Sequence, residues 1–332
     1  MRIYADNAAT TKISKTVIEA MAECMGQTCG SPSSLHSSGL RAAEVLAGAR
    51  ESVALVLGAE PKEIIFTSGG SEADNQAVRS AARWGKKVGK MHLISTAFEH
   101  HAVLHTLKKL EDEGFAVTLL PVHEDGIVRV EDVRAALRED TALVSVMFAN
   151  NEIGTVQPIK EIGALCRENG VIFHTDAVQA AGHIRIDVKE MQIDMLSLSA
   201  HKFHGPKGVG ALYVRKGVPL FSFIEGGAQE RGRRAGTENV PGIVGMAEAL
   251  RLASEKLEER AVYERTLRDT LIEGLSKIPH SRLNGDREKS LPGNVNFCFE
   301  GIEGESLLLL LDAKGIEASS GSACTSGSLD PS

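Results

Sequence analysis

Short apolar runs alternate with helix-patterned segments through the first two-thirds of the chain. Runs of this kind occupy residues 63–66, 92–95, 117–120 and 143–147, with amphipathic stretches such as 133–137 between several of them. Short apolar runs separated by helical periodicity are typical of buried parallel strands with helices on both faces of the sheet. The sequence therefore predicts an α/β fold with a mainly parallel sheet.

Two further apolar runs, Val171–Phe173 and Met195–Leu198, lead directly into polar residues that include Asp176 and Lys202. Parallel strands present such residues at the carboxyl edge of the sheet, where open α/β sheets bind ligands. An acid and a lysine at this edge suit pyridoxal 5'-phosphate (PLP), because the lysine forms the Schiff base and the acid keeps the pyridine nitrogen protonated. The pair thus points to an enzyme that acts on amino acids.

Each of these residues also has an ordinary structural interpretation. Lys202 could be a solvated loop lysine, and Lys207 is a rival for the same role. Asp176 could cap a following helix. His201 and His204 have a spacing that a metal could use, but no cysteine or carboxylate completes the three or four ligands that zinc requires. We therefore expect no metal.

The segment 67–75 follows an apolar run and contains two adjacent glycines, Gly69 and Gly70. Ser71 and Asp74 have the spacing of a capping box at the start of a helix. Backbone N–H groups at such a start, with the Ser71 hydroxyl, could seat a phosphate. An ordinary capped strand-turn-helix is the alternative. Ser199 and His201 could add phosphate contacts, and with them the phosphate seat is favoured.

Two other residues carry possible chemistry. Cys324 lies among small residues at 319–328, which favours an accessible, mobile thiol, whereas Cys166 and Cys298 fit packed positions. His100 could stack on a ring or move protons near neutral pH, although a structural role is the usual one and His101 stands beside it.

Composition limits the class of protein. The 332 residues carry 37 basic and 44 acidic side chains, a net charge of −7, with no polybasic run, which argues against nucleic acid as a partner. The start has no signal-like apolar core, and the leucine run 307–311 is too short to span a bilayer. Five cysteines in a chain of this size favour reduced thiols. We expect a cytoplasmic protein without a membrane partner.

The pattern changes in the last third. A long charged helical stretch covers 244–275, an alternating strand-like segment covers 294–299, and 305–311 is helix-patterned. These elements predict a second, smaller α+β domain. We assign residues 15–250 to the large domain, and residues 1–14 and 251–332 to the small one, which carries the Cys324 loop.

Together these segments resemble the NifS/IscS-type cysteine desulfurases, which are class V aminotransferases of PLP fold-type I. The resemblance runs from Tyr4 to the last residue and rests on segments 4–11, 32–36, 68–75, 99–100, 150–154, 176–179, 201–202 and 236–238. The loop Ser320–Cys324 is similar to that of the long-loop group. The resemblance implies a seven-stranded-type sheet in the large domain.

The resemblance also implies a role for each matching residue. Lys202 would anchor PLP, Cys324 would be the nucleophile, and His100 would stack on the ring and could share proton transfer with Lys202. The other cofactor-binding positions would be Asp176 at the pyridine nitrogen, Gln179 at the phenolic oxygen, Asn151 near the substrate, and Gly70, Ser71, Ser199, His201 and Thr237 at the phosphate. Thr237 would serve the neighbouring subunit, which implies a homodimer.

The implied reaction converts L-cysteine to L-alanine and leaves the sulfur as a persulfide on Cys324. A sulfur-acceptor or iron–sulfur scaffold protein would then receive the sulfur for iron–sulfur cluster or thio-cofactor biosynthesis. Two alternatives stay open: a selenocysteine lyase, and a catalytically impaired desulfurase-like scaffold. Transamination is less favoured because it gives Cys324 no role.

Two positions depart from the family's pattern. Ser31 stands where asparagine is usual, which predicts only a local change in a turn. The family also continues past the cysteine loop with a segment that carries the arginine for the substrate carboxylate. We expect either that the small domain lacks this C-terminal end, with poor use of cysteine, or that the segment lies outside the printed sequence.

Overall fold

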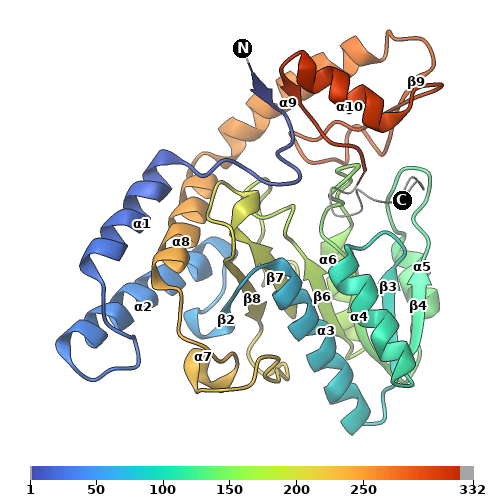
Figure 1. Cartoon of the computed structure of the whole chain (residues 1–332). Helices are drawn as coiled ribbons and strands as arrows, with labels where there is room; N and C mark the ends of the chain where they lie inside the picture. Colours follow the sequence, from blue (N-terminus) through green and yellow to red (C-terminus); the bar gives the residue numbers. More distant parts are fainter. Residues whose placement is uncertain (1, 322–332) are drawn as a thin grey trace.

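The computed structural model describes residues 2–321, so Cys324 lies outside the described residues. Its centre is a seven-stranded sheet of order β2-β8-β7-β6-β5-β3-β4 (Figure 1). The strands are β2 (Ile64–Thr67), β3 (His92–Thr96), β4 (Ala116–Leu120), β5 (Thr141–Ser145), β6 (Ile172–Asp176), β7 (Met195–Ser199) and β8 (Gly210–Val214).

The sheet is mainly parallel. The pairs β3–β4, β3–β5, β5–β6 and β6–β7 run parallel, whereas β8 runs antiparallel to both β7 and β2. The α/β prediction is therefore confirmed. Because β7 and β8 pair from Ser199 with Gly210, the segment between them is the loop of a hairpin, and this loop carries Lys202.

Alternate residues of the strands feed two separate apolar cores. Phe66, Val144 and Leu196 belong to one core, and their neighbours Ile65 and Leu143 belong to the other. This follows from the two-residue period of a strand, which sends successive side chains to opposite faces. A sheet buried on both faces explains why its strands appear in the sequence as continuous apolar runs.

Helices cover both faces of the sheet. Side chains of α3 (Gly70–Lys87) and α4 (His101–Asp112) line one core, and those of α2 (Ser37–Leu57), α6 (Ile159–Glu168) and α8 (Val240–Glu255) line the other. α1 (Lys15–Gln27) packs on α8. α5 (Val130–Ala136) lies against α6, and α7 (Gln229–Gly232) is a short turn before α8. The short 3₁₀ helices are η1 (Pro61–Glu63) and η2 (Ala200–Lys202).

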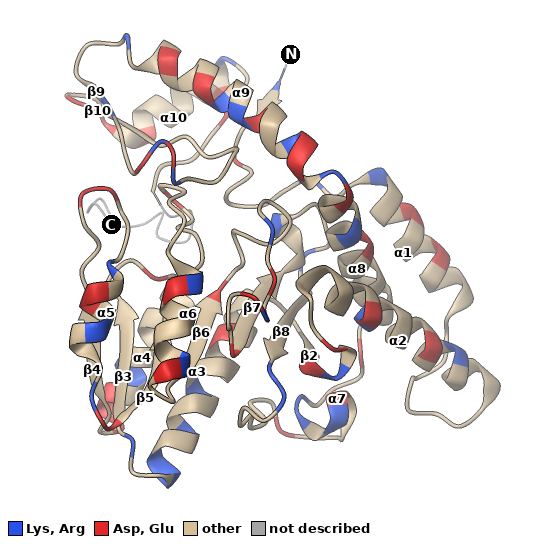
Figure 2. Ribbon diagram, turned by 180° about the vertical axis from the view of Figure 1, so that it is seen from behind, with Lys and Arg blue, Asp and Glu red and all other residues tan. Residues whose placement is uncertain are grey.

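The remaining elements lie beyond one edge of this body (Figure 1). They are α9 (Leu257–Leu275), the antiparallel pair β9 (Ser281–Leu283) and β10 (Phe297–Phe299), α10 (Gly304–Ala313), and the parallel pair β1 (Ile3–Tyr4) and β11 (Ile316–Glu317). Basic and acidic side chains are interspersed along α9 (Figure 2). The helix expected at 305–311 is confirmed as α10.

Two sequence-based boundaries are wrong. The stretch 244–275 is not one helix, because Lys256 adopts φ −121° and ψ 32° and separates α8 from α9. The strand expected at 294–299 is limited to Phe297–Phe299, because β9 offers only three partner residues. In the part of the chain that the structure describes, no helix is both long enough and apolar enough to cross a bilayer.

Candidate active site

The loop between β7 and β8 that carries Lys202, called the lysine loop, contacts the N-terminal segment of the chain. Lys202 Nζ donates hydrogen bonds to the carbonyl oxygens of Ala8 and Ala9, the second at 3.0 Å. Gln179, three residues past the end of β6, donates its Nε2 to the same Ala8 carbonyl at 2.9 Å. Two predicted residues from different strand ends are thus brought to one point on the N-terminal segment.

Thr11 fixes this arrangement from the other side of the loop. Its hydroxyl donates to the carbonyl of His201 at 2.7 Å and accepts from the backbone N–H of His204 at 2.8 Å. The His201 ring lies against the Thr10 hydroxyl, with 3.1 Å between Nδ1 and Oγ1. Burial lowers the pKa of His201 to about 4, and the charges of Lys202 and Lys207 act in the same direction. His201 is therefore neutral at physiological pH.

Asp176 ends strand β6, and its side chain is buried. Its Oδ1 accepts a hydrogen bond from the backbone N–H of Val178 at 2.9 Å. Burial raises the pKa of this carboxyl, whereas the Val178 bond and the nearby His100 and Lys202 lower it. The net effect is a pKa above the usual value, while the Val178 N–H and Lys202 favour the ionised form that an anchor for a protonated ring nitrogen needs.

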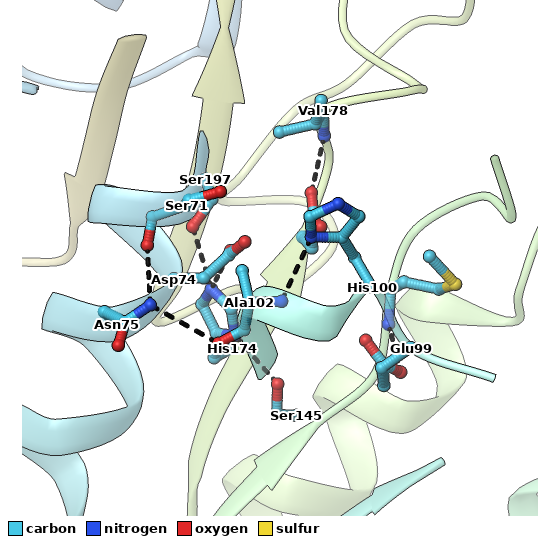
Figure 3. Close-up of polar contacts among 12 residues, drawn as sticks. Ser71, Asp74, Asn75, Glu99, His100, Ala102, Ser145, His174, Val178 and Ser197 are labelled. Carbon is cyan, nitrogen blue, oxygen red and sulfur yellow. Dashed lines mark hydrogen bonds and ion pairs between the residues drawn. The ribbon is translucent and has the colours of Figure 1, made fainter. Parts of the chain in front are cut away.

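His100 stands at the start of α4, where its Nδ1 accepts from the backbone N–H of Ala102 at 3.1 Å (Figure 3). An accepting Nδ1 places the proton of the neutral ring on Nε2. Burial lowers the pKa of His100, and Lys202 lowers it further while Asp176 raises it. Asp176 ends β6, Lys202 follows β7 and His100 follows β3. These three residues therefore lie at the carboxyl edge of the sheet.

After the loop from β2, helix α3 begins without a side chain that caps its first N–H groups. Gly69 has φ 155°, a conformation that side chains rarely adopt, and it precedes α3 without any side-chain cap. Since a helix start leaves its first N–H groups unsatisfied, they can receive an anion. Ser71 lies exposed in this first turn. A Cβ built on Gly70 would lie 3.7 Å from the Cβ of Ser199, which shows that the two predicted phosphate segments adjoin.

The expected capping box is wrong. The Ser68 N–H is instead bound by the carboxylate of Glu72 at 2.8 Å, and Arg234 holds that carboxylate through Nε at 2.9 Å. Asp74 is buried below the helix, where its carboxyl lies 3.6 Å from Nε2 of His174 (Figure 3). The spacing of Ser71 and Asp74 matched a cap, but the helix begins at Gly70, two residues too early for that pairing.

The matches to known proteins agree with this geometry. The model of the family described as aminotransferase class-V matches residues 3–331. The chain belongs to the class-V aminotransferase family. Among curated relatives, the cysteine desulfurase IscS of Methanosarcina thermophila is 57% identical over 99% of this chain and 81% of its own length. The cysteine desulfurase IscS of Clostridium botulinum strain Hall is 55% identical over 100% and 84%.

Solved structures of similar fold include a NifS-like protein with TM-score 0.94 and 43% identity, covering 97% of this chain and 88% of that one. Another, described as SspA in complex with cysteine, has TM-score 0.84 and 36% identity, covering 98% and 91%. Within the class-V aminotransferases, the chain is therefore of the NifS/IscS type, and its fold is that of PLP fold-type I.

Other residues of this class-V aminotransferase have less defined surroundings. Asn151 is half-buried in the turn after β5, and Thr237 is exposed in the loop before α8. Lys207 is exposed on the far part of the lysine loop, so Lys202 is the lysine that acts on Asp176 and His100. Cys324 lies outside the described residues. Residues 2–321 contain no cluster of three or more His, Cys, Asp or Glu suited to a metal.

Sequence reasoning missed a buried polar layer behind the site. It contains Asp74, His174 and Glu99, with Ser145 and Ser197 as hydrogen-bond partners (Figure 3). The only signal was the presence of polar residues, such as Ser145 and Ser197, within otherwise apolar strands. Burial raises the pKa of Glu99 to about 8, so this carboxyl is largely protonated at neutral pH.

The residues present fit PLP. A phosphate needs N–H donors, and α3 begins without a side-chain cap beside Ser199. A protonated ring nitrogen needs a buried carboxylate, and Asp176 is one. A Schiff base needs an amine within the same site, and Lys202 supplies it.

Proposed function

We propose that this protein is a PLP-dependent cysteine desulfurase that converts L-cysteine to L-alanine and transfers the sulfur to Cys324. The observation that carries the proposal is the meeting of Lys202, Asp176 and His100 beside the open start of α3. NifS/IscS-type relatives that share half or more of their residues over nearly the whole chain have the same named activity.

The chain's residues would hold PLP at its carbonyl carbon, its ring and ring substituents, and its phosphate. Lys202 would bind its carbonyl carbon, Asp176 its ring nitrogen, and Gln179 its phenolic oxygen, with the His100 ring stacked on it. Its phosphate would be bound by Gly70, Ser71, Ser199 and His201, and by Thr237 of a second copy of the chain. When bound, PLP withdraws the electrons that are released when a proton leaves the α-carbon of an amino acid.

The residues around that carbon perform the proton chemistry. Lys202, as a free amine, would accept the α-proton of the substrate and return it. His100 is a neutral ring with its proton on Nε2, so it can donate at that atom. The Val178 N–H and the nearby Lys202 favour the ionised form of Asp176. Asn151 would lie near the amino-acid end of the substrate.

Cys324 completes the reaction as a thiolate that attacks the sulfur of the substrate. The carbon–sulfur bond of cysteine breaks, a sulfur–sulfur bond to Cys324 forms, and a proton at the former sulfur-bearing carbon yields alanine. The persulfide would pass to a sulfur-acceptor or iron–sulfur scaffold protein. Cysteine is both the substrate and the source of the transferred sulfur, so no other oxidant is needed.

The proposal includes an organisation and a setting. Residues 15–250 would form the PLP-binding domain, and residues 1–14 and 251–332 the domain that carries the cysteine loop. A homodimer would let Thr237 complete the neighbouring site, and the cytoplasm would supply cysteine and the acceptor. These features agree with the exposed position of Thr237 and with the location of α9 and α10 beyond the sheet.

The test is to incubate the purified protein, loaded with PLP, with L-cysteine and to quantify alanine and persulfide on Cys324. Equal amounts of the two products support the proposal. We expect Lys202→Ala to form neither product and Cys324→Ser to form no persulfide, whereas the matched control Lys207→Ala forms both. Bound PLP without either product would contradict the activity and favour a scaffold role. Faster turnover with selenocysteine would instead favour a lyase.

A further inference from the structure

A second buried carboxyl lies directly behind Asp176. Asp74 projects from α3, and its side chain is 1% exposed. Its Oδ1 has no hydrogen-bond partner among the described residues. Its surroundings are the ring of His174, the hydroxyl of Ser197 and the carboxyl of Asp176, which is within hydrogen-bonding reach.

Two adjoining carboxyl groups cannot both be ionised when they are shielded from water, because each charge is desolvated and repels the other. A protonated His174 could neutralise one of them, but its ring is fully buried. Its Nδ1 and Nε2 bind the hydroxyls of Ser145 at 2.8 Å and Ser197 at 3.0 Å (Figure 3). Burial lowers the pKa of His174 to about 3, so the ring stays neutral. One of the two acids must therefore hold a proton.

The surroundings decide which acid holds it. Asp176 accepts the Val178 N–H and is close to two groups that can carry positive charge, His100 and Lys202, all of which favour its ionised form. The Ser197 hydroxyl favours the ionised form of Asp74, but burial and then the charge of Asp176 outweigh it and raise the pKa of Asp74 well above the usual range. The proton therefore belongs on Asp74.

We propose that Asp74 is a neutral acid that donates a hydrogen bond to Asp176 and so positions the Asp176 carboxylate for the ring nitrogen of PLP. This inference rests on the proposed binding of PLP. Asp74 is a positioning residue, because it acts through Asp176 and touches no substrate atom. A protonated Asp74 is uncharged, so its Oδ1 needs no hydrogen-bond donor. The Oδ1 of a buried carboxylate would require one.

The position of Asp74 on α3 gives this contact a further consequence. The same helix begins at Gly70, beside the phosphate seat, and reaches Asp74 one turn later. One rigid element therefore sets both the place of the phosphate and the support of the ring anchor.

The protonation state is tested by infrared spectroscopy of the purified protein at neutral pH. Protonated carboxyl groups have a carbonyl-stretch band that carboxylates lack. We expect Asp74→Asn to remove one component of this band. The control is Glu99→Gln, which removes the other neutral acid near the site and should delete a different component. An Asp74→Asn spectrum with the wild-type band unchanged would overturn the proposal.

The positioning role is tested by titrating PLP into the cofactor-free protein. In the Asp74→Asn variant the new side-chain amide still donates to Asp176, so the dissociation constant for PLP should stay within about threefold of wild type. Asp74→Leu removes the donor and should weaken binding by about tenfold to a hundredfold, the range for hydrogen bonds to charged groups. Equal losses in both variants would contradict the donor role. If Asp74→Leu fails to fold, the infrared result on Asp74→Asn still decides.

These measurements separate the inference from the proposed function. Wild-type protein that binds PLP but yields no alanine or persulfide would refute the desulfurase activity and leave both Asp74 tests valid. Active protein whose Asp74→Asn variant keeps every carboxyl band would refute the neutral acid and leave the activity in place.

Discussion

His100 caps helix α4 with its own ring, because Nδ1 accepts the backbone N–H of Ala102 at 3.1 Å. Because Nδ1 accepts this hydrogen bond at the start of the helix, the proton of the neutral ring is on Nε2. The same side chain therefore has a structural role beside its proposed catalytic one, and the two can be separated by substitution.

We expect His100→Asn to keep the cap, since asparagine is also a good N-cap acceptor, and to lose the ring. Its thermal midpoint should stay near that of wild type while alanine formation falls by about 10²-fold or more, as for loss of an acid–base group. His100→Ala should in addition lose about 0.5–2 kcal/mol of stability. Wild-type turnover by His100→Asn would show that the ring has no part in catalysis.

The buried Glu99 predicts a loss of stability at alkaline pH. Its pKa is 4.5 when unfolded and about 8 when folded, so the folded state holds a proton that the unfolded state releases. The stabilisation is complete below 4.5 and is lost as pH rises through about 8, by up to about 1.4 kcal/mol per pH unit. Denaturant unfolding at several pH values should show a steeper decline in wild type and in Glu124→Gln, an exposed control, than in Glu99→Gln, which keeps only the contribution of Asp74.

The ion pair between Arg50 and Glu230 predicts a large energetic effect. Both guanidinium nitrogens reach the carboxylate at 2.7 Å, with side-chain exposures of 12% and 2%. Removing one partner of a buried pair costs about 3–5 kcal/mol, because the other charge stays unpaired. Glu230→Gln should show this loss in urea unfolding. The matched control Glu190→Gln breaks an exposed pair with Lys160 and should cost less than about 1 kcal/mol.

The glycine before α3 should be needed for the phosphate seat. Gly69→Ala forces a side chain into φ 155°, which costs about 1–3 kcal/mol and turns the first N–H groups of the helix. In this variant both the affinity for PLP and the stability should fall. Gly48→Ala, at an exposed helical position where a Cβ meets nothing within 4 Å, should instead stabilise by about 0.5–1 kcal/mol. Unchanged PLP binding by Gly69→Ala would argue against a phosphate at this helix start.

The Thr11 hydroxyl should help to hold the lysine loop, beside the Thr11 backbone N–H, which donates to the His201 carbonyl at 2.9 Å. Thr11→Val keeps the shape but leaves the His204 N–H and the His201 carbonyl without that partner, at a cost of about 1–3 kcal/mol. Thr11→Ser keeps the hydroxyl and should behave like wild type in thermal unfolding and in PLP titration. Equal loss in both variants would assign the effect to the methyl group.

The local pattern of apolar runs predicted the features that depend on where the strands end. The apolar runs before Asp176 and Lys202 identified both the strands and the edge of the sheet that the two residues share, because parallel strands align their carboxyl ends. The prediction of the site's centre needed no tertiary information beyond that rule.

The rest depends on contacts between distant segments, which periodicity does not report. Asp74 has the spacing of a cap and lies instead in the core, since the helix begins at Gly70. Helical periodicity continues through Lys256, so the break between α8 and α9 left no local signal. The hydrogen-bond partners of Thr11 are some 190 positions away in the sequence, and no sequence motif predicts them.

The parallel pairing of β1 with β11 has a consequence for how the protein is made. Ile3 pairs with Ile316, and Asp6 accepts a hydrogen bond from Ser319, 313 positions away. Strand β1 therefore pairs only after residues more than 300 positions later have been synthesised, whereas the seven-stranded sheet is complete once Val214 has emerged. Contacts of such sequence separation form late and slowly. Translation thus yields a folded sheet first, and the N-terminal strand docks only after almost the entire described chain is available.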